Sequence, residues 1–400
     1  MTAKLPNRRI RLLLAVFVVA FAAMFVRAAW LQAVRAQDLG RLAQSQHRTT
    51  VVDPGGRGTI FDRRGIQLAI GRQATTVYAN PRQIADPEAV AAVVAKTLGL
   101  HAEEVEQLLS DDSRGFVYVA RKADPKRAKL LERQKIVGLG FLSEEKRIYP
   151  QGHVAAQVLG YAGTDNRGLS GLEIGLDRVL RGRPGREEIV RDPSGRAISV
   201  LSSTAAEEGQ DVHLTIDHTL QANAEAVLRQ TIERWQAESA SAVVLDPRTG
   251  GLLAMAVERG YDANRFPIVP KDLQRNRTVT DTYEPGSTFK VVTVSAALSE
   301  GLVTPRTVFT LPYELQVADR RIRDAHERGT ERMTVDEIIS KSSNVGTITL
   351  AQALGSKRLA AWVKRFGFGS ETGIDFPGQT PSFATVAYAA AICTGVTATP

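Results

Sequence analysis

Ser287 and Lys290 are the residues whose types and spacing point most directly to chemistry. They lie in the stretch YEPGSTFK at 283–290, which leads into an apolar run ending near Ser299. Pro-Gly-Ser is typical of a helix N-terminus, and positions i and i+3 share one helix face. The run is apolar nearly all round, which predicts a buried helix. Burial lowers the pKa of a lysine, and a desolvated amine beside a serine can make that serine a nucleophile.

The four-residue spacing alone is weak evidence, because it occurs twice. Ser143 and Lys146 are separated by two glutamates, and this charged middle predicts a solvated surface segment. For Ser287 the plainer alternative is a helix-capping serine followed by a lysine that extends to solvent. The residues downstream favour the chemical interpretation.

Ser342 and Asn344 form a second polar cluster downstream of the first pair. Thr334 and Glu337 match a capping box, which predicts a helix just before the cluster. Ser342 and Asn344 then fall where this helix gives way to the next one. On its own this cluster is weak evidence, and it gains weight because it follows the Ser287–Lys290 pair.

The C-terminal half predicts the elements that must position these residues. A strand at 212–216 precedes an amphipathic helix, and a hairpin is expected at 241–245 and 252–257. The helix carries one apolar face, made of Leu220, Ala224, Leu228, Ile232 and Trp235. Strands beside buried helices indicate an α/β sandwich with a mainly antiparallel sheet.

The N-terminal half predicts a separate domain of strands and helices. A strand within 57–65 closes on a turn at Arg64-Gly65. Other strands are expected at 75–79 and 116–120, and helices at 87–100, 102–109 and 125–134.

Two glycine-rich stretches, 147–152 and 168–185, imply turns that need a positive φ. We interpret their charged residues as structural ion pairs rather than catalytic groups. A ribbon at 189–200, turning at 192–195, leads to a polar linker at 202–210. We place a domain boundary in that linker.

The N-terminus predicts a membrane anchor. Basic residues precede an apolar run at 12–26: Lys4, Arg8, Arg9 and Arg11. With Arg27 reaching the interface beside Trp30, residues 12–31 are long enough to span a bilayer. The alternative is a signal peptide cleaved near residues 20–22. In both cases the basic end stays in the cytoplasm and the remainder is exported; residues 32–48 then continue as a polar helix.

Composition excludes several classes of function. The chain has 400 residues and a net charge of +8, with no basic stripe interleaved with aromatics, so we expect no nucleic-acid binding. The single cysteine, Cys393, excludes an intramolecular disulfide. The six histidines are scattered without metal-ligand spacing, so we expect no metal and no cofactor.

With these residues in place, the chain resembles the class B penicillin-binding proteins, which are membrane-anchored peptidoglycan D,D-transpeptidases. Ser-x-x-Lys followed by Ser-x-Asn belongs to the signature of penicillin-binding proteins and serine β-lactamases. The resemblance covers about residues 10 to 380 and includes the segments 57–65, 147–152, 168–185, 214–217, 324–326 and 372–378. The segment 275–287 looks most like the division-specific (septal) branch.

The resemblance implies an architecture of four parts. They are a cytoplasmic tail (1–11), a single transmembrane helix (12–31), a non-catalytic, dimerisation-like α+β pedestal domain (32–207) and an α/β transpeptidase domain (208–400). The last part has an antiparallel sheet with helices. The implied location is the cell inner membrane, with the catalytic domain in the periplasm.

The resemblance also implies the roles of the site residues. Ser287 would attack the penultimate D-Ala of a stem peptide, Lys290 would act as general base, and Ser342 and Asn344 would relay protons and hold the peptide. The residues expected to bind substrate are Glu284, Gly286, Thr288, Ser343 and Gly346. The implied partners are D-Ala-D-Ala stem peptides, β-lactams, a membrane glycosyltransferase and other division proteins.

One expected motif is missing from the sequence. No Lys-Thr-Gly or Lys-Ser-Gly follows Asn344. Cys393-Thr394-Gly395 is a poor substitute, because cysteine lacks the positive charge that would bind the substrate carboxylate. We therefore expect a transpeptidase domain that is C-terminally incomplete from about residue 380. Two alternatives stay open, a catalytically inactive division scaffold and a β-lactam sensor or β-lactamase on the same fold.

Overall fold

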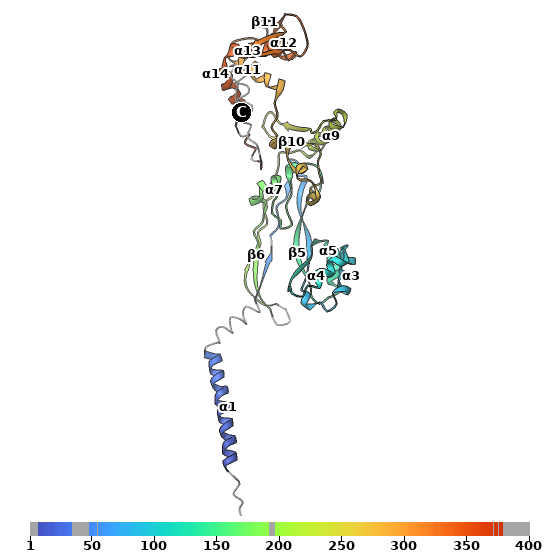
Figure 1. The fold of residues 1–400 in the computed structure, drawn as a ribbon, viewed down its shortest axis with the longest axis vertical. Helices are drawn as coiled ribbons and strands as arrows, with labels where there is room; N and C mark the ends of the chain where they lie inside the picture. Colours follow the sequence, from blue (N-terminus) through green and yellow to red (C-terminus); the bar gives the residue numbers. More distant parts are fainter. Residues whose placement is uncertain are drawn as a thin grey trace, which may run out of the picture. The chain divides into compact units, whose positions relative to one another are not determined.

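The computed structural model describes residues 7–33, 48–53, 55–191, 197–370, 372–374 and 376–378 (Figure 1). The chain divides into two compact units. Unit 1 contains Met1–Gly58, Gln73–Glu145 and Val179–Asp211, and unit 2 contains Thr59–Arg72, Lys146–Arg178 and Val212–Pro400. The boundary predicted at 207/208 stays a prediction. Two segments of the expected pedestal, Thr59–Arg72 and Lys146–Arg178, belong to unit 2.

The first helix, α1 (Asn7–Ala33), carries the predicted apolar run (Figure 1). Within it, Arg11–Trp30 is long and apolar enough to cross a membrane. The polar helical continuation expected after residue 33 lies outside the described residues as far as residue 47, and strand β1 begins at Arg48.

A three-stranded antiparallel sheet in unit 1 contains the predicted ribbon. Its order is β1 (Arg48–Asp53), β6 (Gly185–Arg191) and β7 (Ala197–Thr204). The turn predicted at 192–195 lies outside the described residues. The linker predicted from residue 202 starts too early, because Thr204 still pairs with Arg186 at the end of β7.

The rest of unit 1 contains three α-helices, a 3₁₀ helix and most of three strands, in which β3 pairs with both β4 and β5. Its elements are β3 (Gln67–Ala79), η1 (Pro81–Gln83), α3 (Pro87–Leu98), α4 (Ala102–Leu109), β4 (Val117–Ala123), α5 (Pro125–Glu132) and β5 (Leu139–Ile148). Asp86 caps α3 through the Ala89 N–H, and Gly99 ends it with φ 76°, a conformation that favours glycine. The predicted helices and the strand at 116–120 are confirmed, with ends shifted by up to three residues. The strand predicted at 75–79 is the end of the longer β3, and β5 was not predicted.

Several short elements lie within or near the glycine-rich stretches and beside the start of the C-terminal half. They are β2 (Ile60–Phe61), α6 (Ala156–Leu159), α7 (Gly171–Gly175), α8 (Asp177–Leu180) and β8 (Val212–His213), with β2 parallel to β8. Arg147 and Glu173 form a buried ion pair at 2.7 Å, and Glu173 also accepts from Tyr149. The interpretation of these charges as structural is therefore confirmed for this pair.

Helix α9 (His218–Trp235) corrects one prediction. Leu228 of the expected apolar face is buried, but Leu220 and Trp235 are exposed. The buried positions include Gln221 and Glu225 instead. Gln221 makes this possible because its amide accepts from the Met255 N–H and donates to the Met255 carbonyl, as a neighbouring strand would.

The remaining elements of unit 2 follow α9 along the chain and include those that carry the predicted site. They are β9 (Ser241–Leu245), β10 (Leu252–Val257), η2 (Ala263–Ile268), η3 (Lys271–Gln274), α10 (Arg277–Thr280), η4 (Gly286–Phe289), α11 (Lys290–Ser299), β11 (Val308–Leu311), β12 (Glu314–Val317), β13 (Arg320–Arg323), β14 (Glu331–Thr334), α12 (Val335–Ser340), α13 (Asn344–Leu354) and α14 (Ser356–Arg365). The hairpin β9–β10 is confirmed residue for residue, and β11–β14 and β12–β13 are also antiparallel pairs.

Helix α11 belongs to two hydrophobic clusters at once. Val294 and Ala297 pack with residues of β11, β14, α12 and α13, whereas Val292 and Ala296 pack with residues of α13 and α14. Only Val291 among its apolar side chains is exposed by half. This packing on both sides, which the sequence predicted, fixes the helix whose first residue is Lys290.

Candidate active site

Ser287 and Lys290 lie one turn apart, but the turn is tighter than predicted. Residues Gly286–Phe289 form a 3₁₀ turn, and α11 begins at Lys290 rather than at Ser287. In a 3₁₀ turn the side chains at i and i+3 eclipse, so both residues keep a common face. Gly286 has φ 56°, which favours glycine, and Ser287 is exposed.

The Lys290 amine reaches the second polar cluster. Its Nζ donates to the Ser342 carbonyl at 2.5 Å, to the Ser342 Oγ at 3.0 Å and to the Asn344 Oδ1 at 2.6 Å. Burial lowers the pKa of Lys290, and the charge of Asp324 acts in the opposite direction. Three donated bonds describe the ammonium form. A lowered pKa increases the share of the neutral amine, which can accept a proton from a neighbouring hydroxyl.

The loop between α12 and α13 presents those acceptors. Helix α12 begins with the predicted capping box, in which Thr334 and Glu337 bond each other's backbone N–H. Ser342 has φ 55°, so the chain turns sharply there. Ser343 then caps α13 by accepting from the Gly346 N–H at 2.9 Å.

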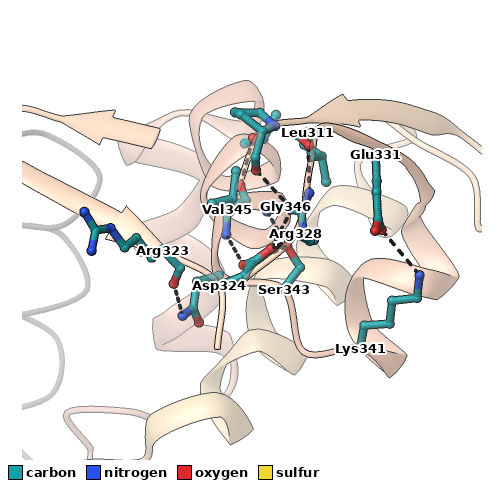
Figure 2. A network of polar contacts seen from close by, with 12 residues as sticks. Leu311, Arg323, Asp324, Arg328, Glu331, Lys341, Ser343, Val345 and Gly346 are labelled. Atoms are coloured by element: carbon teal, nitrogen blue, oxygen red, sulfur yellow. Dashed lines mark hydrogen bonds and ion pairs between the residues drawn. The ribbon is translucent and has the colours of Figure 1, made fainter. Parts of the chain in front are cut away.

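A carboxylate from the end of β13 supports this loop from behind (Figure 2). Asp324 accepts from the Ser343 Oγ at 3.0 Å and from the Val345 N–H at 3.0 Å. Arg328 holds the same carboxylate at 2.6 Å and donates to the Leu311 carbonyl at 2.9 Å. Burial alone would raise the pKa of Asp324, but the hydrogen bonds from Val345, Arg328 and Ser343 lower it.

Three of the four predicted catalytic residues are brought into direct contact: Lys290, Ser342 and Asn344. Ser287 shares the turn of Lys290, yet no hydrogen bond joins the two among residues that the structure describes. Catalytic hydrogen bonds are often loose without substrate.

The predicted substrate-binding residues divide into two groups. Glu284, Gly286 and Thr288 are exposed beside Ser287, so contact with a substrate stays a prediction for them. Ser343 and Gly346 are buried, and contact with a substrate stays a prediction for them too. Ser343 bonds Asp324, and a Cβ on Gly346 would lie 2.7 Å from Ile338, so both residues shape the loop.

Sequence reasoning missed the roles of Asp324 and Arg328, because no local pattern connects residue 324 to residue 343. The same reasoning expected no metal, and the described part of the chain contains no group of three or more potential metal ligands. The site therefore offers an exposed hydroxyl, a proton-accepting amine and two oriented polar groups, which suits nucleophilic catalysis by serine.

Comparison with known proteins agrees with this chemistry. Residues 52–214 match the penicillin-binding protein dimerisation domain, and residues 240–400 match the penicillin-binding protein transpeptidase domain. The chain is 31% identical to the probable peptidoglycan D,D-transpeptidase PbpC of Pseudomonas aeruginosa, over 96% of this chain and 68% of that protein. The chain belongs to the class B penicillin-binding proteins. The resemblance and the two-domain fold inferred from the sequence are thus confirmed.

Two further similarities define the extent of the match. The chain is 33% identical to the peptidoglycan D,D-transpeptidase FtsI of Escherichia coli (strain K12), over 93% of this chain and 64% of that protein. It therefore spans about two thirds of the length of this relative. Penicillin-binding protein 2X from Streptococcus thermophilus has a similar structure, with a TM-score of 0.67 and 25% identity, over 87% of this chain and 57% of that one.

Proposed function

We propose that this penicillin-binding protein is a serine D,D-transpeptidase that cross-links peptidoglycan stem peptides through an acyl-enzyme on Ser287. One observation carries the proposal. The Lys290 amine is partly desolvated, has a lowered pKa and is held by Ser342 and Asn344, one turn from an exposed serine hydroxyl. The similarity to relatives named peptidoglycan D,D-transpeptidase supports the same activity.

The reaction follows from the positions of these groups. The Ser287 Oγ attacks the carbonyl carbon of the penultimate D-Ala while its proton passes to the Lys290 Nζ. The amide bond then breaks, and the terminal D-Ala leaves with a proton returned through Lys290 and Ser342. An amine of a second stem peptide attacks the ester carbonyl, loses its proton to the same groups and releases the Ser287 Oγ.

The polar groups around the amine have separate tasks in this scheme. The first turn of a helix leaves N–H groups free, and the Ser287 N–H would stabilise the developing oxyanion there. Asn344 would hold the peptide while its Oδ1 orients the amine. A β-lactam would acylate Ser287 by the same attack, with its ring amide in place of the D-Ala-D-Ala bond.

The proposed location is the cell inner membrane, with α1 as a single-pass anchor and the catalytic domain in the periplasm. The apolar stretch Arg11–Trp30 and the basic residues before it support this orientation. The proposed process is septal cell-wall synthesis, with a membrane glycosyltransferase and other division proteins as partners. The similarity to FtsI of Escherichia coli supports the septal role.

Labelling with fluorescent penicillin tests the proposal on the full chain in detergent. We expect wild-type protein and Ser143→Ala to form a stable covalent adduct, and Ser287→Ala to form none. Circular dichroism of each variant shows whether it is folded. A folded wild-type chain without label would contradict the enzyme and support an inactive scaffold, whereas a label that is rapidly lost by hydrolysis would support a sensor or β-lactamase.

A further inference from the structure

Asp324 contacts the segment around Asn344 through both oxygens of its carboxylate. Its carboxylate accepts from the Ser343 Oγ at 3.1 Å and 3.0 Å and from the Val345 N–H at 3.0 Å (Figure 2). These two residues flank Asn344, which contacts the Lys290 amine. The carboxylate therefore fixes the backbone on both sides of a residue that faces the amine.

The neighbouring residue of β13 orients the carboxamide itself. The Asn344 Nδ2 donates to the Arg323 carbonyl at 2.7 Å, while its Oδ1 accepts from the Lys290 Nζ at 2.6 Å. A carbonyl only accepts and an ammonium only donates, so these two partners allow one orientation of the amide. Residues 323 and 324 thus hold three consecutive residues at the start of α13, from Ser343 to Val345.

Arg328 anchors Asp324 in turn. Its guanidinium contacts the carboxylate through Nε at 3.1 Å and Nη2 at 2.6 Å. It also donates to the carbonyls of Leu311 and Pro312 at 2.9 Å and 3.0 Å. Both ions are almost fully buried, with exposed side-chain fractions of 11% and 8%. A buried carboxylate held from both sides is a rigid support, because moving it would leave a charge unpaired.

We propose that Asp324 is a positioning residue for the acylation reaction, which keeps the Ser342–Asn344 segment in register with the Lys290 amine. The proposal rests on the proposed function, since it assigns Lys290 as the base. Asp324 makes no hydrogen bond to Lys290 in the described residues, so it acts through the loop and through its field.

Asp324→Asn tests the proposal, with Asp319→Asn as the matched control. Asp319 is exposed at the turn of the same hairpin, β12–β13. We expect Asp324→Asn to lower the plateau rate of acylation by fluorescent penicillin by about tenfold to a hundredfold, because a small displacement of catalytic groups has that effect. We also expect the acidic limb of its pH profile to move to lower pH, because the charge that opposes deprotonation is lost.

A second measurement keeps the two proposals apart. The reactivity of Lys290 toward an amine-specific reagent, followed by mass spectrometry across a pH series, reports its protonation without any penicillin. We expect the midpoint for Lys290 to be lower in Asp324→Asn than in wild type and unchanged in Asp319→Asn. Thermal unfolding of the same samples measures any general loss of stability.

The outcomes are distinct. Wild-type profiles for both acylation and Lys290 reactivity in Asp324→Asn would overturn the positioning role, as would a loss of stability with both profiles unchanged. Penicillin labelling that does not depend on Ser287 would instead contradict the proposed function. In that case the Lys290 reactivity series still decides whether Asp324 controls the amine.

Discussion

The chain contains the pattern Ser-x-x-Lys twice, and the two copies have different surroundings. Ser143 and Lys146 lie within strand β5, whereas Ser287 and Lys290 span the 3₁₀ turn that leads into α11. Side chains three positions apart point to opposite faces of a strand but to one face of a helical turn. The same spacing therefore separates the first pair and aligns the second.

The residues between serine and lysine differ in the same way. Ser143 and Lys146 are exposed as predicted, but the glutamates between them are not fully solvated. Glu144 accepts from Thr76 and pairs with Arg121, and Glu145 accepts from the Arg57 N–H. In this copy the bonds to distant parts of the chain are made by the two glutamates, and in the other copy they are made by Lys290. The partners of the amine, rather than the pattern, distinguish a reactive site from a surface strand.

The largest expected effect comes from removing each lysine in turn. Lys290→Ala should reduce the acylation rate by about a thousandfold or more, since general-base catalysis contributes on the order of 10²–10⁴. Lys146→Ala should label like wild type. Single-turnover acylation by fluorescent penicillin measures both, and circular dichroism checks that the variants are folded. Unchanged labelling of Lys290→Ala would refute the assignment of the base.

The pH dependence of acylation should distinguish Lys290 from an ordinary, solvated lysine. Because burial lowers the pKa of Lys290, acylation should rise with pH and level off below the ordinary lysine pKa, changing about tenfold per pH unit on the rising limb. The folded chain then binds fewer protons than the unfolded chain between the lowered and the ordinary pKa. The free energy of unfolding should therefore rise with pH in that window, and Lys290→Met should lose this rise. An acylation rate that begins to level off only at the ordinary lysine pKa would contradict the prediction.

Removing Glu144, which lies between Ser143 and Lys146 in β5, should lower stability without changing acylation. Glu144→Ala leaves Thr76 and Arg121 without this carboxylate, which should cost about 1.5 kcal/mol of unfolding free energy. Glu132→Ala, at the exposed end of α5, is the control. Denaturant unfolding gives the difference, and penicillin labelling should not change. A loss of labelling would mean that the strand copy matters to the site after all.

The smallest expected effect concerns the helix that leads into the loop. Thr334→Ala removes the side-chain cap of α12 and should lower the free energy of unfolding by about 1 kcal/mol, while Thr334→Ser should retain most of it. The exposed Thr330→Ala serves as the control. Equal stability of the alanine and serine variants would show that the capping box does not stabilise α12.

Much of the fold could be predicted because its signals are local. The hairpin β9–β10, the capping box of α12 and the apolar run of α1 each depend on residues within a few positions. Helix α9 was harder, because Gln221 is buried through bonds to Met255, 34 positions away. An apolar stripe predicts burial only where no polar side chain finds such a partner.

The sequence by itself determined the types of the chemical groups, their local spacing and the helix ends that present them. Only the tertiary structure decided that Lys290 meets Ser342, 52 positions away, and that Asp324 holds Ser343 across 19 positions. Local patterns are set by neighbouring residues along the chain. The approach of distant side chains depends on how α11, α12 and α13 pack around a common core, and spacing in the sequence carries no record of that packing.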